Sequence, residues 1–201
     1  MKRVIHFLIV LITVSFISHA AYAIPITFVA NLTGANEVPP VASVGTGQAI
    51  VVLDATAQTI RLSVTFSGLG SPDVAAHIHC CLSSPLLSGV NVGVATTVPA
   101  FVGFPLGVTS GTYSSVVFDL TQSTIYNPAF ITLEGGLPQA EAALIAGIEG
   151  GQTYFNIHTM NNPGGEIRSQ LFAVAAPEPA SLVLLGSALM GLGMIWRRRR
   201  A

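Results

Sequence analysis

Apolar and polar residues alternate with a period of two along much of the chain, and this pattern predicts antiparallel β-structure. In the first such run the apolar residues are Ile26, Phe28, Ala30 and Leu32. Residues 49–53 and 60–66 repeat the alternation on either side of a turn at 54–58. Because successive side chains of a strand point to opposite faces, each run buries one face, and the last two form a hairpin.

Further strands are expected at residues 74–79, 92–97, 111–120, 153–159 and 166–174, separated by glycine, proline and asparagine. Residues 98–107 are expected to form a packed loop. Residues 138–148 are alanine-rich with a proline at the start, which predicts one short helix. The predicted fold class is therefore all-β, an antiparallel Greek-key sandwich or barrel with one short helix.

Both ends of the chain are expected to be apolar helical targeting segments. Residues 1–23 have a signal peptide's charged start, apolar core and A-x-A cleavage site, at Ala21 and Ala23. Residues 177–201 combine a short Pro-Glu-Pro motif, an apolar run at 182–196 and four arginines. Such a run predicts a short transmembrane segment with the arginines on the cytoplasmic side. The domain that folds is then residues 24–176.

The motif Pro177, Glu178 and Pro179, with its apolar run and basic end, resembles the PEP-CTERM sorting signal of exopolysaccharide-producing bacteria. The resemblance implies recognition by an exosortase-type membrane protease and delivery to the cell surface or beyond. The membrane would hold the chain through this segment only before processing. An ordinary C-terminal anchor is the alternative explanation.

Residues 24–176 carry few charges and almost no cations. Two arginines, Arg61 and Arg168, face eight carboxylates, which gives a formal net charge of −6 and leaves no lysine. A surface without clustered cations cannot neutralise phosphates, so nucleic acid and anionic lipid are excluded as expected partners.

Three histidines carry the clearest chemistry. His77 and His79 alternate on one predicted strand and share a face, while His158 lies on another. Imidazole suits copper and zinc, so the three could form a metal site with an open position. The alternative is that each histidine is structural, with a hydrogen bond to a backbone carbonyl.

Cys80 and Cys81 follow His79 directly and are the only cysteines. Adjacent cysteines cannot close a long loop. Three alternatives remain: a vicinal disulfide, which we favour, a disulfide between chains, or soft metal ligands beside the histidines.

Five motifs in order across residues 26–173 resemble the chordin (CHRD) domain: 36–40, 68–69, 75–79, 156–159 and 163–168. The resemblance implies an extracellular immunoglobulin-like β-sandwich. In animals such domains occur in a secreted growth-factor antagonist, a role that the fold alone does not transfer.

A more distant resemblance is to copper-zinc superoxide dismutase, an eight-stranded Greek-key barrel. It implies that His77, His79 and His158 match three copper ligands and that Arg168 matches an arginine that attracts the anionic substrate. The bridging and zinc histidines have no counterpart here, so a complete dismutase is not implied.

Other polar residues receive structural interpretations. Glu166 and Arg168 alternate on a strand and are expected to form a solvated edge pair. Glu37 is expected to fix a turn through backbone hydrogen bonds.

Three functions remain open. The first is a noncatalytic surface or matrix module associated with exopolysaccharide or matrix proteins. The second is a copper-type metal-binding or redox protein. The third is a protein-interaction domain that would use an exposed apolar loop at residues 101–106.

Overall fold

A computed structural model of the chain describes residues 24–83, 90–174 and 187. The targeting segments predicted at 1–23 and 177–201, with their sites at Ala21, Ala23 and Pro177 to Pro179, lie outside the described residues except for Ser187. In the described part of the chain we find no helix with the length and apolar character that a membrane span requires.

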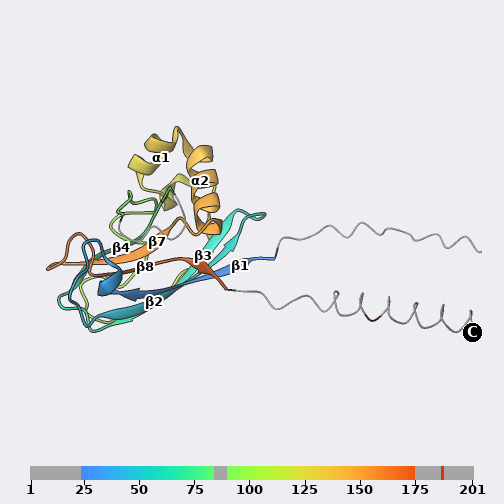
Figure 1. Ribbon diagram of the computed structural model, residues 1–201. Coiled ribbons are helices and arrows are strands. Elements are labelled where there is room, and N and C mark those ends of the chain that lie inside the picture. The colour runs from blue at the N-terminus through green and yellow to red at the C-terminus, as the bar shows by residue number, and fades with distance from the viewer. Residues whose placement is uncertain (1–23, 84–89, 175–186, 188–201) are drawn as a thin grey trace, which may run out of the picture.

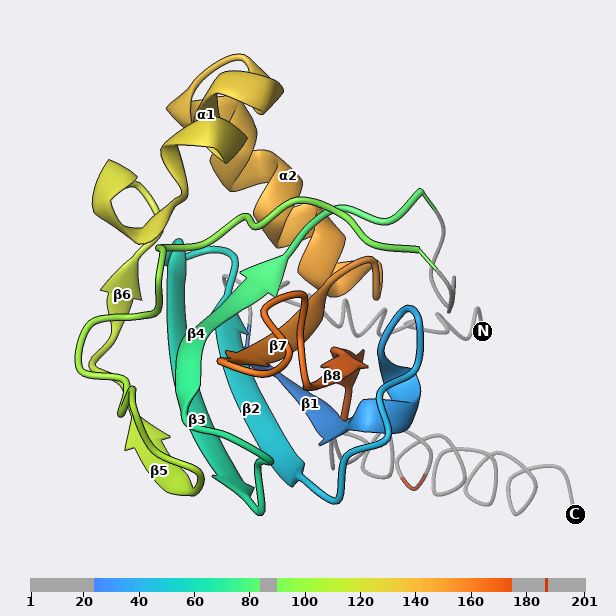
Figure 2. The same ribbon diagram turned by 90° about the vertical axis from the view of Figure 1, so that its left-hand side faces the viewer.

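The strands form one curled sheet, open along one side like half a barrel (Figure 2). Its principal strands are β1 (Ile26–Thr33), β2 (Thr46–Asp54), β3 (Thr59–Ser67), β4 (Asp73–His79), β5 (Gly111–Ser114), β7 (Tyr154–Thr159) and β8 (Ile167–Gln170). They lie in the order β4-β7-β8-β1-β2-β3-β5, and every neighbouring pair is antiparallel. The short strands β6 (Phe118–Asp119) and β9 (Phe172–Ala173) pair with β3 and β1.

The predicted antiparallel β-architecture is confirmed, including the hairpin of β2 and β3. Its alternate residues Val51, Leu53, Leu62 and Val64 are buried. Asp54 fixes the turn, because its Oδ1 accepts hydrogen bonds from the backbone amides of Thr56 and Ala57. The Greek-key, immunoglobulin-like and superoxide-dismutase-like details of the fold remain predictions.

Two α-helices lie together beside β4 and β7, where the sequence predicted one (Figure 1). Helix α2 (Leu137–Glu149) extends the predicted 138–148 by one residue at each end. Helix α1 (Pro128–Glu134) was not predicted; Asn127 caps it by accepting from the amide of Ala129, and Gly135 ends it in the left-handed conformation. Two short 3-10 helices, η1 (Gly34–Asn36) and η2 (Ser123–Ile125), complete the described elements.

Three strand predictions were wrong in detail. Residues 92–97 form isolated bridges, at Val94 and Thr96, instead of a strand. Residues 111–120 and 166–174 each divide into two short strands. In both cases the run contains a break in pairing that alternation alone does not reveal.

The loop at residues 98–107 is packed, as predicted, and this removes the proposed interaction loop. Phe101 and Phe104 are buried in the core, and Phe104 stacks on Phe66 with ring centroids 5.7 Å apart. Only Val102 and Leu106 are exposed large apolar residues within 101–106. The expected exposed apolar loop is therefore wrong for its two aromatic residues, whose rings complete the core.

Candidate metal centre

The pairing of β4 with β7 brings the three histidines to one place. The register sets His77 opposite Asn156, His79 opposite Tyr154, and Ala75 opposite His158. Directly opposed residues of an antiparallel pair project from the same face, so all three imidazoles lie on one side of these strands. The intervening residues Ala76 and Ile78 belong to the apolar core on the other side.

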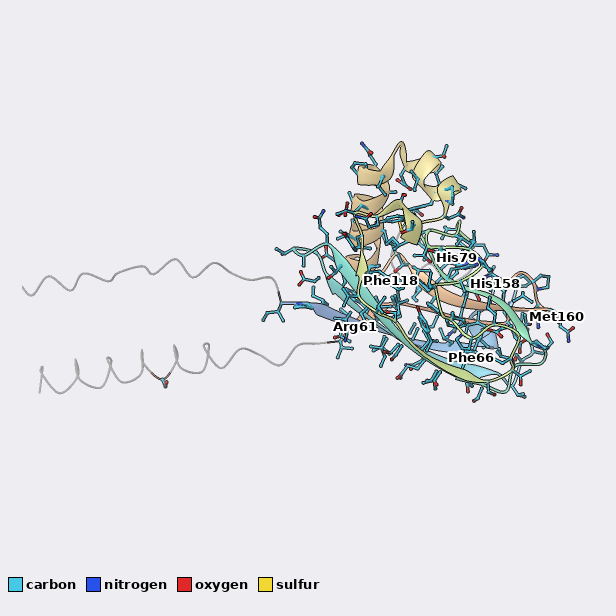
Figure 3. The ribbon with its side chains drawn as sticks, turned by 180° about the vertical axis from the view of Figure 1, so that it is seen from behind. Arg61, Phe66, His79, Phe118, His158 and Met160 are labelled. Carbon is cyan, nitrogen blue, oxygen red and sulfur yellow. A yellow bond between two sulfur atoms is a disulfide. The ribbon has the colours of Figure 1, made fainter. Side chains whose placement is uncertain are left out.

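The imidazole rings are in mutual contact. Ring centroids lie 4.6 Å apart for His77 and His158, 4.9 Å for His77 and His79, and 5.7 Å for His79 and His158. One nitrogen from each ring lies within 4.8 Å of the other two. Figure 3 shows His79 and His158 together, with Met160 farther out. A tetrahedral ion with bonds of about 2 Å separates its ligands by about 3.3 Å, so small ring rotations would complete a site.

Backbone carbonyls orient two of the rings. His79 Nδ1 lies 2.7 Å from the carbonyl oxygen of Val92, and His158 Nδ1 lies 3.0 Å from that of Pro163. A carbonyl oxygen only accepts, so each Nδ1 carries the proton and each Nε2 presents a lone pair. Carbonyl partners of this kind orient histidine ligands in metal sites.

Three buried ring nitrogens have no hydrogen-bond partner: His77 Nδ1, His79 Nε2 and His158 Nε2. Buried polar atoms are normally paired, because leaving one without a partner is unfavourable. A group of three in one place therefore requires an explanation. If the histidines were purely structural, hydrogen bonds to backbone carbonyls would explain the Nδ1 atoms of His79 and His158. They would not explain the three nitrogens without partners.

Burial keeps the cluster neutral. Desolvation, followed by the mutual repulsion of the rings, lowers the pKa of His77 to about 2. Desolvation also lowers the pKa of His79, to about 4, and that of His158. Neutral imidazole is the form that binds metal, so the cluster stays ready for an ion in mildly acidic solution.

Tyr154 and Arg168 extend the centre along the same face. The Tyr154 ring stacks on His79, and the guanidinium carbon of Arg168 lies 4.5 Å from the centre of the Tyr154 ring. Arg168 Nε donates to the carbonyl of Asn36 at 2.7 Å, and its Nη1 donates to Asn91 Oδ1. The same guanidinium lies 3.9 Å from the Glu37 carboxylate.

The expected solvated edge pair of Glu166 and Arg168 was wrong. Both residues are buried, and each has its own partners. Glu166 accepts hydrogen bonds from Ser43, Thr159 and the amide of Gly70, and these lower its pKa against the effect of burial. Strand β8 lies between β7 and β1, and the segment that contains Asn36 covers the Arg168 side chain.

Glu37 was also misread. Its carboxylate is buried beside Arg168, its Oε1 has no hydrogen-bond partner, and desolvation raises its pKa to about 7 although Arg168 opposes the rise. The sequence signal for this placement was the run 36–40, which belongs to the chordin-like motifs.

Cys80 and Cys81 are joined by a disulfide. Their sulfur atoms lie against α2, where a Cβ on Gly147 would come within 2.5 Å of the Cys80 sulfur. Among the described residues, the group whose ligand atoms converge contains the three histidines and neither sulfur.

Fold and site together define an antiparallel β-protein with a buried three-histidine cluster. Residues 28–171 match the family model of the CHRD domain, and the chain belongs to that family. Residues 175–200 match the PEP-CTERM protein-sorting motif, which supports export and sorting by a membrane exosortase to a cell-surface or extracellular location. No curated protein and no solved structure matches the chain.

Proposed function

We propose that this chain is an exported surface protein whose CHRD domain binds one copper-type metal ion through His77, His79 and His158. The observation that carries the proposal is the convergence of three neutral, buried imidazoles with unpaired nitrogens. Copper(II) is favoured over zinc because nitrogen sites follow the Irving–Williams order.

The surrounding contacts support a preorganised site. The carbonyls of Val92 and Pro163 fix two tautomers, and the Tyr154 ring supports His79 from one side. Preorganised ligands bind better because less ordering is needed when the ion arrives. We propose a noncatalytic role for the ion, as a structural or carried metal.

The location follows from the two ends of the chain. We propose that residues 1–23 are removed after export by cleavage behind Ala23, and that residues 24–176 form the working domain. Residues 182–196 would hold the chain in the membrane until an exosortase acts at Pro177, Glu178 and Pro179. The domain would then join the exopolysaccharide layer or its matrix proteins. The matched sorting motif supports the exosortase step.

Copper titration of the full-length chain, purified in detergent and treated with chelator, tests the metal proposal. We expect one copper ion per chain with micromolar affinity or better, measured by calorimetry and elemental analysis. His79→Asn keeps a donor for the Val92 carbonyl and removes Nε2, so it should abolish binding. Met160→Leu is the matched control, because it removes a nearby exposed sulfur ligand and should bind normally. Absence of binding at equimolar micromolar copper would contradict the proposal.

A further inference from the structure

A second candidate site lies beside the histidine cluster. It is a cavity of about 370 Å³ between the segment that follows β1 and the strands β7, β8 and β9. None of the three histidines lines it. The residues that carry the argument are Glu37, Val38, Arg168, Gln170 and Phe172, all of which line the cavity. Its volume falls within the range of small-molecule sites, roughly 300 to 1,000 Å³.

The cavity wall has unused hydrogen-bonding capacity of both kinds. Glu37 Oε1 and Gln170 Nε2 are buried without partners. Among the described residues, Arg168 Nη2 donates one long hydrogen bond, 3.4 Å, to the carbonyl of Val90. Gln170 is half-buried, so its amide can rotate toward a ligand. Rotation of the Glu37 and Gln170 side chains toward the cavity would present one acceptor and one donor to a ligand, beside the Arg168 guanidinium.

The charges in the wall oppose each other. Arg168 and Glu37 lie 3.9 Å apart and, within the part of the chain that the structure describes, are the only charged residues lining the cavity. Their formal charges cancel, so the cavity does not select a strongly charged ligand. Hydroxyl groups, which both donate and accept, suit this pair better than a carboxylate or an ammonium group.

Part of the wall is apolar and includes an exposed aromatic ring, beside the polar Asn36, Ser169 and Tyr154. Val38, Pro40, Leu82 and Val90 line the cavity with Phe172, which is 43 % exposed. An exposed aromatic face beside paired polar groups provides apolar contact on one side of a ligand and hydrogen bonds on the other. A pyranose ring has the same division, with C–H groups on its face and hydroxyls around its edge.

We propose that this cavity binds a neutral pyranose unit, with its hydroxyls at Arg168, Glu37 and Gln170 and its C–H face on Phe172. The binding itself does not depend on the metal. The further step, that the bound sugar is a unit of the surrounding exopolysaccharide, rests on the surface location proposed above.

Saturation-transfer NMR on the full-length chain in a sugar-free detergent tests the proposal. The probes are D-glucose, D-galactose, D-mannose, L-rhamnose and N-acetyl-D-glucosamine, with D-glucuronate as the charged comparison. We expect at least one neutral sugar to bind. Retention of the chain on a dextran column distinguishes a polymer unit from a free sugar, and either result is consistent with the proposal.

Two variants locate the binding. Phe172→Ala should weaken it about tenfold, as expected for loss of an aromatic contact worth about 1.4 kcal/mol. Leu133→Ala removes an apolar side chain on α1 that is more exposed still, at 75 %, and should have no effect. Ala35→Trp, at an exposed position of the cavity wall, should block binding.

Three outcomes would overturn the proposal: no neutral sugar binds, only glucuronate binds, or binding survives Ala35→Trp. Circular dichroism and copper stoichiometry of each variant identify any that fails to fold. Failure of sugar binding with normal copper binding contradicts only this proposal, and the reverse result contradicts only the metal proposal.

Discussion

The ring of Tyr154 stacks on the imidazole of His79, with centroids 4.5 Å apart and planes inclined by 11°. The other side of the same tyrosine carries a cation, because the Arg168 guanidinium carbon lies 4.5 Å from its centroid. Tyr154 therefore joins the candidate metal centre to the neighbouring cavity, which it also lines. Its stack holds His79 in the orientation that the Val92 carbonyl requires.

Replacing Tyr154 should disturb the metal centre through this stack. Tyr154→Ala removes the ring and should lower the free energy of unfolding by about 3 kcal/mol or more, as for other buried aromatics. It should also weaken copper binding, because His79 loses its support. Tyr154→Phe keeps the ring and removes only the hydroxyl, which lies 3.3 Å from the nitrogen and the carbonyl oxygen of Val92, so it should weaken copper binding less than the alanine variant does. Equal copper affinity for the alanine variant, measured by titration, would show that the stack does not position His79.

Copper should stabilise the folded chain, and its removal should reverse the effect. A ligand at a hundred times its Kd adds about 2.7 kcal/mol to the stability of the state that binds it. The melting temperature in a thermal scan should therefore rise by several degrees with copper and return after chelation. The scan of His79→Asn should not respond to copper. An equal rise in that variant would place the ion elsewhere.

The apo protein should lose stability as the pH falls below 6.5. The unfolded histidines then bind protons, while folded His77 and His79, whose pKa values are lowered to about 2 and about 4, stay neutral. The pKa of folded His158 is lowered as well, so it binds its proton later than in the unfolded chain. Each such histidine costs about 1.4 kcal/mol per pH unit until its folded pKa is reached. Chemical denaturation between pH 7 and 4.5 should show this decline, and a flat profile would contradict it.

Glu37 should oppose part of that decline. Its folded pKa, raised to about 7, exceeds the ordinary 4.5, so the folded state binds the proton first and gains stability as the pH falls through this window. Glu37→Gln removes the gain, and its stability should fall more steeply than that of the parent chain between pH 7 and 4.5. A shallower fall in the stability of Glu37→Gln would show that Glu37 does not stabilise the folded chain as the pH falls.

The two arginines of the domain should differ sharply in their contribution to stability. Arg168→Met removes the donors to Asn36 and Asn91 and leaves the Glu37 carboxylate buried without its cation. Breaking a buried pair in this way costs about 3 to 5 kcal/mol. Arg61→Met is the matched control, because Arg61 is exposed on β3, and its denaturation midpoint should barely change.

Replacing Gly147 by alanine, the smallest possible side chain, should destabilise the protein. A methyl group there would lie 2.5 Å from the Cys80 sulfur and 2.9 Å from the Cys81 sulfur, so α2 and the disulfide would have to separate. Gly147→Ala should lower the free energy of unfolding by about 1 to 3 kcal/mol despite the better helix propensity of alanine. Gly164→Ala, where a Cβ meets nothing within 4 Å, should change it by less than about 0.5 kcal/mol.

Alternation predicted the strands well where a single face is buried, as in β1, β2 and β3. It failed for Arg168 because alternation shows which residues share a face and does not show what covers that face. Here the outer face of β8 lies under the segment that contains Asn36, and a charged side chain is buried. Helix α1 is too short for a periodic signal, and only its ends, Asn127 and Gly135, mark it in the sequence.

The sequence was sufficient to predict which histidines could form the candidate site. It was not sufficient to predict that the three lie close together. The spacing of His77 and His79 put two rings on one face. Their approach to His158 depends on the pairing of β4 with β7, which are separated in the chain by two short strands, a 3-10 helix and two α-helices. Strand order of this kind is not encoded in local periodicity. The role of Tyr154 depends on the same pairing, and that of Glu37 depends on the pairing of β1 with β8, so both were missed.

The position of β4 at the margin of the sheet bears on how the protein would respond to metal. Its one full strand partner is β7, and single-residue bridges at Val94 and Ala100 cover its other side. An ion shared by His77, His79 and His158 would cross-link this outermost strand to its inner neighbour. Metal binding should therefore suppress the local opening of β4. The amide hydrogens of β4 should exchange more slowly with metal bound, while those of the interior strands should exchange at an unchanged rate.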